Sequence, residues 1–283
     1  MKFHEIYAKN PNEIKFSFEV FPPADAEKLQ RLKETLEKLS EFKPKFVSLT
    51  WGAGGKSNQA ENLISDISAV GFDVMPHFTC VCSTKEYVEY HLEKLENLDI
   101  DKILALRGDI PEDKSLMHHE FHYACDLVEF IKNKSHLDIA VAGYPEGHIE
   151  TPDLNTDLAN LKKKVDKGAN AIFTQMFFDN NKLYKYIEKV HNIGIDLPII
   201  PGIMPILSKK QIDKMTNLAR ISIPKNLQNN IEKYQNSGSD MQKFGIEYAT
   251  TQCQDLISQG IKNLHFYTLN KSTSIKQILY NIL

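Results

Sequence analysis

The chain has 283 residues, of which 42% are hydrophobic and 25% are charged, and its formal net charge is -3. This composition excludes intrinsic disorder and collagen-like repeats, and four cysteines in this length exclude a disulfide scaffold. The weakly acidic balance argues against nucleic-acid binding driven by bulk charge. No apolar run reaches the ~20 residues that span a bilayer, and the first residues lack the apolar core of a signal peptide. We therefore expect a cytoplasmic protein of a size typical of enzymes.

Short β-rich segments alternate with longer helical patterns from one end of the chain to the other. The expected strands, in chain order, are Phe16–Val20, Lys45–Thr50, Asp73–Phe78, Lys102–Leu106, Asp138–Ala142, Ala171–Thr174, Pro198–Pro201 and Asn263–Tyr267. Leucines at three- and four-residue spacing predict helices between them, as over Ala26–Phe42. Glycines should end several of these helices shortly before the next strand: Gly71, Gly168, Gly194 and Gly260.

Eight strands, each followed by a helix, predict a single (β/α)8 TIM barrel that uses residues 1–283. The longer gap between the seventh and eighth strands predicts extra helix there, with candidates at Ser208–Leu218, after Pro224 and at Met241–Gln259. An open, doubly wound sheet is the alternative. Such sheets usually carry an early G-x-G-x-x-G fingerprint, and none follows the first strand here.

Polar residues gather where the expected strands end, which is where a TIM barrel carries its chemistry. In chain order they are Glu19, Thr50, His77, Arg107-Gly108-Asp109, Tyr144 and His148, Gln175, and Tyr267 with Lys271. Because polar groups in apolar strands are costly unless paired or functional, this clustering predicts one pocket. Glu19 is the most informative position. Desolvation in an apolar strand disfavours the ionised form of its carboxyl, which suits a general acid near neutral pH. An ion-paired structural glutamate is the alternative.

The helical segment that begins at Leu154 carries a polar stripe beside its apolar one. Asp157, Asn160 and Lys164 lie at positions i, i+3 and i+7, with Lys163 beside them. A solvated helix face would explain the stripe. At the rim of the expected pocket, however, the lysines could meet a phosphate, and the other two could bind ribose hydroxyls or adenine. The stripe therefore favours a nucleotide-bearing cofactor.

A metal site is the main rival explanation for the clustered residues. Two groups of candidate ligands are close in sequence: His77, Cys80 and Cys82, and His118, His119 and His122. Neither group has the spacing of a CxxC pair or an HExxH helix, and the first strand lacks the His-x-His of barrel hydrolases. We expect no metal, and a metal-dependent barrel hydrolase is retained as an alternative.

Sequence blocks over nearly the whole chain are similar to those of the methylenetetrahydrofolate reductase family and occur in the family's order. They are Phe18–Pro23, Phe46–Ala53, Pro76–Cys80, Ala105–Asp109, Tyr144–His148, Lys164–Asn170, Thr174–Phe178, Pro201–Pro205 and His265–Asn270. The chain resembles the bacterial form, which has the catalytic domain alone.

The resemblance implies a flavoprotein TIM barrel that holds FAD non-covalently. NADH or NADPH would reduce the flavin in a ping-pong reaction, and the flavin would reduce methylenetetrahydrofolate to methyltetrahydrofolate for methionine synthesis. Glu19 matches the family's general acid, and Asp109 matches a second catalytic carboxylate that contacts flavin and folate. A non-catalytic subunit that binds flavin or folate is a further alternative.

The same resemblance assigns the other site residues. Positions that match FAD contacts are Thr50, Trp51, Ala53, His77, Arg107, Gly108, Asp109, Tyr123, Ala124, Tyr144, His148, Asp157, Asn160, Lys163 and Lys164. Positions that match substrate contacts are Glu19, Asp109, Gln175, Gln211, Tyr267 and Lys271. The family more commonly has Tyr at 51, Arg at 163 and 271, and an aromatic residue at Met215, so these contacts differ in geometry. Relatives are commonly oligomeric, so we expect a homo-oligomer without nucleic-acid or membrane partners.

Overall fold

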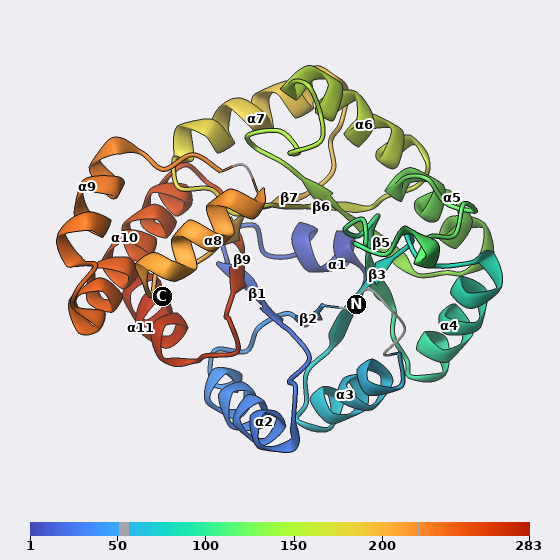
Figure 1. Ribbon diagram of the computed structural model, residues 1–283, viewed down its shortest axis with the longest axis horizontal. Helices are drawn as coiled ribbons and strands as arrows, with labels where there is room; N and C mark the ends of the chain where they lie inside the picture. Colours follow the sequence, from blue (N-terminus) through green and yellow to red (C-terminus); the bar gives the residue numbers. More distant parts are fainter. Residues whose placement is uncertain (51–56, 220) are drawn as a thin grey trace.

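The computed structural model describes residues 1–50, 57–219 and 221–283. Its parallel strands are β1 Lys15–Val20, β2 Val47–Leu49, β3 Val74–Thr79, β4 Lys102–Leu106, β5 Asp138–Gly143, β6 Ala171–Thr174, β7 Ile199–Ile200, β8 Gly202–Ile203 and β9 Asn263–Tyr267. They pair in the order β7-β6-β5-β4-β3-β2-β1-β9-β8. Since β7 and β8 form the two ends of this order yet adjoin each other in the chain, the sheet curls into a barrel (Figure 1). The expected (β/α)8 architecture is confirmed.

The expected seventh strand, Pro198–Pro201, consists of two shorter strands on either side of Pro201. Ile199–Ile200 pairs with β6, whereas Gly202–Ile203 pairs with β9. Proline has no N–H to donate to a ladder, so the pairing is interrupted at this residue. Its carbonyl still accepts the backbone N–H of His265 at 2.9 Å. The chain thus changes strand partner at Pro201, and this change closes the barrel.

Helices surround the strands (Figure 1). They are α2 Ala26–Ser40, α3 Ser57–Ala69, α4 Lys85–Asn97, α5 Ala124–Lys134, α6 Leu154–Asp166, α7 Asn180–Asn192 and α11 Thr273–Ile282. The extra helix expected before the last strand is present as α8 Lys209–Ala219, α9 Lys225–Tyr234 and α10 Gly238–Ser258. The glycines expected to end helices all adopt positive φ angles, namely Gly71, Gly168, Gly194 and Gly260.

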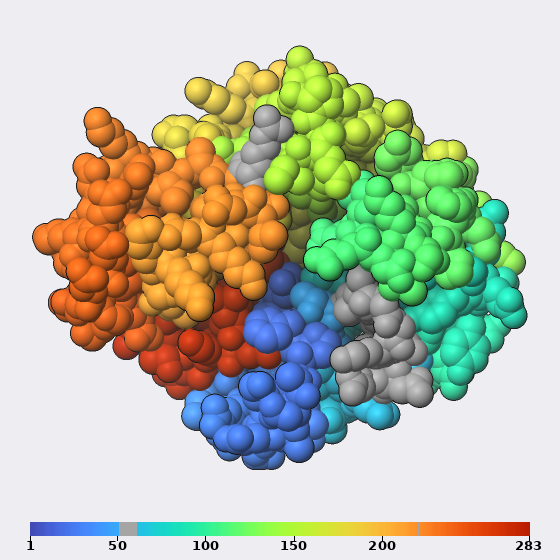
Figure 2. Space-filling model, in the orientation of Figure 1, coloured from blue at the N-terminus to red at the C-terminus, as the bar shows by residue number. Residues whose placement is uncertain are grey.

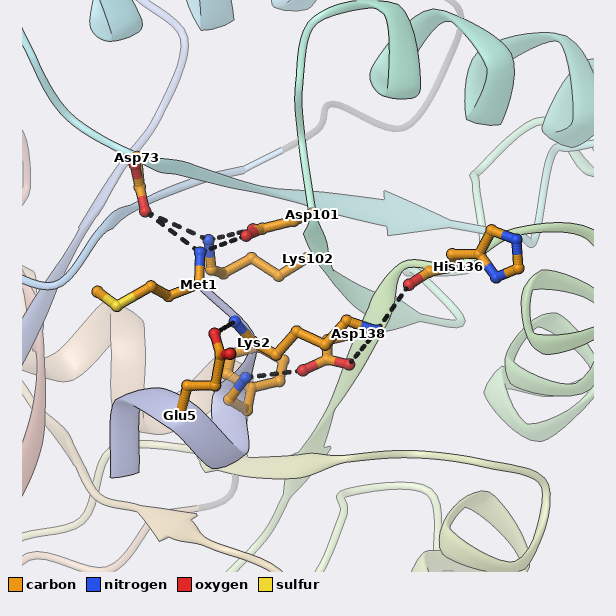
Figure 3. Close-up of polar contacts among 9 residues, drawn as sticks. Met1, Lys2, Glu5, Asp73, Asp101, Lys102, His136 and Asp138 are labelled. Atoms are coloured by element: carbon orange, nitrogen blue, oxygen red, sulfur yellow. Dashed lines mark hydrogen bonds and ion pairs between the residues drawn. The ribbon is translucent and has the colours of Figure 1, made fainter. Parts of the chain in front are cut away.

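A short helix that the sequence pattern did not reveal, α1 Phe3–Ala8, lies against the amino-terminal ends of the strands. Its Phe3 and Ile6 are buried in a cluster with residues of the barrel interior: Phe46, Met75, Leu104, Ala140, Ala171, Phe173 and Ile200. Asp138, at the start of β5, accepts the backbone N–H of Phe3 at 2.7 Å and lies 3.9 Å from the Lys2 ammonium (Figure 3). This helix fills the amino-terminal end of the barrel, so a ligand must enter from the opposite end.

Candidate active site

A cavity of about 460 Å³ lies where the carboxyl ends of β4 and β5 meet α5 and α6. Figure 2 shows the face that carries the βα loops, which is hollowed at its centre between the green segment around α5 and the orange segment of α8. Most residues assigned to FAD line the cavity beside α6: Arg107, Tyr123, Ala124, Tyr144, His148, Asp157, Asn160, Lys163 and Lys164. Its wall also includes residues that the sequence did not single out: Cys125, Glu150, Thr151, Pro152 and Thr156.

The polar stripe of α6 is partly buried against the barrel. Asp157 is 6% exposed and accepts the backbone N–H of His148, and burial raises the pKa of its carboxyl. The Lys164 ammonium donates to the carbonyl oxygen of Ala142 and lies 5.8 Å from the centre of the Tyr144 ring. Burial lowers the pKa of Lys164 to about 8, although Asp157 opposes the shift. A solvated face would leave both side chains exposed, so this half of the stripe belongs to the cavity.

Asn160 and Lys163 form the exposed half of the same stripe. Both side chains lie at the surface, and the Lys163 ammonium is 3.4 Å from the Asn160 side-chain oxygen. Tyr123, which is also exposed, directly precedes α5, and Ala124 begins that helix. These residues therefore line the outer rim of the cavity.

The turn after β4 holds two charged side chains in different environments. Arg107 donates to both carboxylate oxygens of Glu150, at 2.5 and 2.6 Å. Gly108 has a φ of +87°, and a Cβ there would lie 3.0 Å from the Cβ of Thr79, so the turn requires glycine. Asp109 follows in an exposed position, and its charge acts on Arg107.

Glu19 lies at the end of β1, between two buried imidazoles. Its Oε2 is 3.5 Å from His77 Nε2 and 3.6 Å from His265 Nε2. Serine hydroxyls hold both rings, with Ser48 Oγ 2.6 Å from His77 Nε2 and Ser17 Oγ 2.7 Å from His265 Nδ1. Burial lowers the pKa of His77, while the Glu19 charge opposes this shift. The Glu19 side chain is 21% exposed, and the polar side chains of two histidines and two serines lie around it.

Ser17, Ser48 and His265 are absent from the site residues that the sequence predicts. Strand alternation places the side chains of Ser17 and Glu19 on one face of β1, and that face lines the barrel interior. The missing information was the register, in which Ser17 is opposite His265 and Glu19 is opposite Ser48. Register depends on how strands far apart in the chain pair, so a single strand does not reveal it.

The residues assigned to folate lie outside the cavity beside α6. Tyr267 is opposite Glu19 in the strand register and donates to the carbonyl of Thr174 at 2.9 Å; burial raises its pKa. The Gln175 side chain accepts the backbone N–H of Met176 at 3.0 Å. Lys271 is exposed in the turn after β9.

Gln211, in the first turn of α8, contacts the loop that precedes this helix. Its side-chain oxygen accepts the N–H of Leu207 at 2.8 Å, and its amide nitrogen donates to the carbonyl of Pro205 at 3.1 Å. In the structure, this amide therefore holds the segment between β8 and α8. Thr50 lies beside β1, where its N–H donates to the Val20 carbonyl at 3.0 Å, whereas Trp51 and Ala53 lie outside the described residues.

The family model described as methylenetetrahydrofolate reductase matches residues 2–283. The chain belongs to the methylenetetrahydrofolate reductase family. It is 37% identical over 267 residues to the 5,10-methylenetetrahydrofolate reductase of Salmonella typhimurium, covering 94% of this chain and 89% of that protein. It is also 37% identical over 284 residues to methylenetetrahydrofolate reductase (NADH) 1 of Arabidopsis thaliana, covering 94% and 48%. The chain thus spans about half of that plant reductase and most of the bacterial one.

Solved structures support the same fold for this member of the reductase family. An uncharacterized protein from Clostridium thermocellum, described as binding two copies of 5-methyl-5,6,7,8-tetrahydrofolic acid, superposes with a TM-score of 0.66. The two chains are 15% identical, and the match covers 98% of this chain and 97% of the other. This likeness shows a shared fold.

The described residues contain neither a metal-ligand cluster nor a membrane-spanning helix. Within these residues, no three or more His, Cys, Asp or Glu side chains are grouped so that they could hold a metal ion. The described helices of this reductase-family chain also include none that is long and apolar enough to cross a membrane.

Proposed function

We propose that this protein is a cytoplasmic, homo-oligomeric, FAD-dependent methylenetetrahydrofolate reductase with a single catalytic barrel. It would use NADH or NADPH to form methyltetrahydrofolate, the methyl donor for methionine synthesis. The observation that carries the proposal is the position of Glu19, a largely buried carboxyl near the carboxyl end of β1. The neighbouring cavity beside α6 suits a dinucleotide. The family membership supports the same reaction, and relatives are named for either NADH or NADPH.

The cavity beside α6 fits the ADP half of FAD. Lys163 and Lys164 offer positive charge to a pyrophosphate, while Asp157 and Asn160 offer hydrogen-bond partners to ribose hydroxyls or adenine. Its volume of about 460 Å³ lies within the range of roughly 300–1,000 Å³ that is usual for cofactor sites. FAD, when bound, supplies the carrier through which a hydride passes from nicotinamide to folate.

Glu19 is assigned to the proton that the folate needs. The methylene bridge accepts a hydride only after its five-membered ring opens to an iminium cation, and opening requires a proton on the departing nitrogen. The carboxyl of Glu19 is 21% exposed near the carboxyl end of β1, and the buried ring of His77 lies 3.5 Å from its Oε2. A positioned acid of this kind contributes about 10²–10⁴-fold to such a step.

Residues from the turns would orient the folate. The Asp109 carboxylate, exposed beyond β4, would bind the amino edge of the pterin and stabilise the cation. The exposed ammonium of Lys271 would meet the anionic tail of the substrate. Gln175 would help to position both folate and nicotinamide, because the two bind in turn in a ping-pong reaction. Gln211 must release its loop contacts before its amide can bind folate.

Anaerobic half-reactions test the proposal. The purified protein, reconstituted with FAD, should be yellow, should be bleached by NADH or NADPH supplied separately, and should regain its colour with methylenetetrahydrofolate. A protein that cannot be reconstituted with FAD would refute the cofactor. Binding of flavin and folate without turnover would favour the subunit alternative, and chelator-sensitive hydrolysis would favour the metal-dependent hydrolase.

A further inference from the structure

Four neighbouring strands, β9, β1, β2 and β3, carry a group of polar side chains inside the barrel. We call this group the interior polar group: Ser17, Glu19, Ser48, His77 and His265. The remaining strands contribute apolar side chains to the interior, such as Leu104, Ala140, Ala171, Phe173 and Ile200, and their buried charged residues Lys102 and Asp138 are the first residues of β4 and β5, at the opposite end of the barrel. Burying polar groups costs free energy unless they are hydrogen-bonded. The members of the interior polar group contact one another around Glu19, so we infer that they position this carboxyl.

The ring of His265 is fixed on several sides. It is 1% exposed, and its Nδ1 lies 2.7 Å from Ser17 Oγ. The rings of Phe173 and Tyr267 pack edge-on against it, with centroids 5.2 and 5.5 Å away. The other ring nitrogen, Nε2, faces Glu19 Oε2 at 3.6 Å. Because the ring cannot turn, the position of its proton decides whether Nε2 can donate to Glu19.

The partner of one ring nitrogen selects the tautomer of a neutral imidazole. The hydroxyl of Ser17 can donate its proton to Nδ1, which leaves the ring proton on Nε2, directed at Oε2 of Glu19. His77 approaches the same oxygen at 3.5 Å. Within the part of the chain that the structure describes, no hydrogen bond or ion pair engages Oε1 of Glu19. The two carboxyl oxygens thus lie in different environments.

We propose that Ser17 and His265 are positioning residues that keep an N–H donor on Oε2 of Glu19, so that the acidic proton resides on Oε1. This inference rests on the proposed role of Glu19 as the acid. In the protonated carboxyl, Oε2 is the carbonyl oxygen, and shortening the 3.6 Å separation by a few tenths of an ångström lets it accept the Nε2–H of His265. During the reaction, the proton moves from Oε1 to the departing folate nitrogen. The Nε2–H of His265 then stabilises the carboxylate that remains.

The tautomer of His265 can be observed by NMR without any substrate. Histidine labelled with a heavy nitrogen isotope would be incorporated into the wild-type protein, and the His265→Asn variant would identify the His265 signals. We expect the neutral Nε2–H tautomer in the wild type and a mixture of tautomers in Ser17→Ala. A wild-type Nδ1–H tautomer, or an imidazolium at neutral pH, would overturn the inference even if the protein reduced no folate.

Half-reaction kinetics of the FAD-reconstituted enzyme test the consequence for catalysis. In His265→Asn, the side chain is too short to reach Glu19, and oxidation of the reduced flavin by methylenetetrahydrofolate should slow about tenfold, the value of one lost hydrogen bond of about 1.4 kcal/mol. His265→Gln keeps an N–H near the position of Nε2 and should stay within about threefold of the wild type, because the donor is retained. Reduction by nicotinamide and the affinity for FAD should be unchanged in both variants.

The pH profile separates positioning from packing. Loss of the donor disfavours the ionised carboxylate, so in His265→Asn the alkaline decline of the folate step should move to higher pH. Among the described residues, His77 and Tyr267, whose pKa values the Glu19 charge raises, are unchanged in this variant. Equal losses in both half-reactions, or the same loss in His265→Gln as in His265→Asn, would show that His265 only packs. A wild-type enzyme that methylenetetrahydrofolate cannot reoxidise would instead refute the proposed function, and the NMR result would decide the inference.

Discussion

The guanidinium of Arg107 and the carboxylate of Glu150 form a bidentate ion pair that joins the end of β4 to the segment between β5 and α6. The pair raises the pKa of Arg107 and lowers the pKa of Glu150. Both side chains line the cavity beside α6. Since Glu150 balances the charge of Arg107, the positive charge available to an anionic cofactor comes mainly from Lys163 and Lys164.

This pairing predicts a specific pattern in a double-mutant cycle. In Arg107→Ala, the carboxylate of Glu150 remains in the cavity wall without its partner and repels the pyrophosphate. We expect the Kd for FAD to rise at least about tenfold in Arg107→Ala, and to recover about fivefold when Glu150→Ala is added, because the unpaired charge is then removed. Fluorescence titration of FAD against the two single variants and the double variant measures the coupling. A double variant that binds FAD no better than Arg107→Ala would contradict this account.

Lys164 should make FAD binding depend on pH above neutrality. Burial lowers its pKa from 10.5 to about 8, so the ammonium is charged below this pH and loses its proton above it. A bound pyrophosphate favours the charged form and raises the pKa of Lys164, so binding is coupled to proton uptake. Affinity should therefore be highest below about pH 8 and should weaken by up to about tenfold per pH unit above it.

Fluorescence titrations of FAD at a series of pH values test this prediction, and Lys164→Met provides the comparison. The variant should bind FAD more weakly and should lack the alkaline decline. Lys163→Met, on the exposed half of the stripe, is the matched control, because it removes one positive charge but should keep the decline. An equal alkaline decline in the wild type and in Lys164→Met would assign the titration to another group.

Glu19→Gln should separate the two half-reactions. Glutamine keeps the size and a hydrogen-bonding oxygen but has no proton to give to the folate nitrogen. Stopped-flow absorbance should show reduction of the flavin by nicotinamide within about twofold of the wild type, and a loss of roughly 10²–10⁴-fold in its reoxidation by methylenetetrahydrofolate. If folate reduction survived in this variant, the proton would have to come from another group.

Local patterns were sufficient to predict most of the fold. Strand positions followed from short β-rich runs, and the polar stripe of α6 followed from helical spacing, because both patterns depend on neighbours in the chain. The six-residue helix α1 was not predicted, because a helix of this length shows little periodicity and gains its stability from burying Phe3 and Ile6. The break at Pro201 was not predicted either, although a proline inside an expected strand indicates an interrupted hydrogen-bond ladder.

The site was predictable only in part, for a similar reason. The family resemblance supplied the residues of the cavity beside α6, yet the partner of Arg107 was not identified. Glu150 follows His148 by two residues, but its contact with the β4 turn depends on loop packing. His265 likewise lies in one of the sequence blocks that match the family, but no role was predicted for it. Its contact with Glu19 depends on the pairing of β1 with β9, which are far apart in the chain.

Gly245 offers a test of how α10 packs against the segment between β8 and α8. This glycine is buried in the middle of α10, and a Cβ built on it would lie 1.8 Å from the carbonyl oxygen of Ile206. Alanine in a helix interior normally stabilises by about 1 kcal/mol relative to glycine. Here the clash involves backbone, so Gly245→Ala should instead lower the free energy of unfolding by about 1–3 kcal/mol.

Gly238→Ala, at the start of the same helix, is the matched control, because no atom lies within 4 Å of the added Cβ. Urea unfolding followed by circular dichroism would compare both variants with the wild type. Gly238→Ala should be neutral or slightly stabilising. If Gly245→Ala proved as stable as Gly238→Ala, α10 could not be in close contact with Ile206 in the segment between β8 and α8.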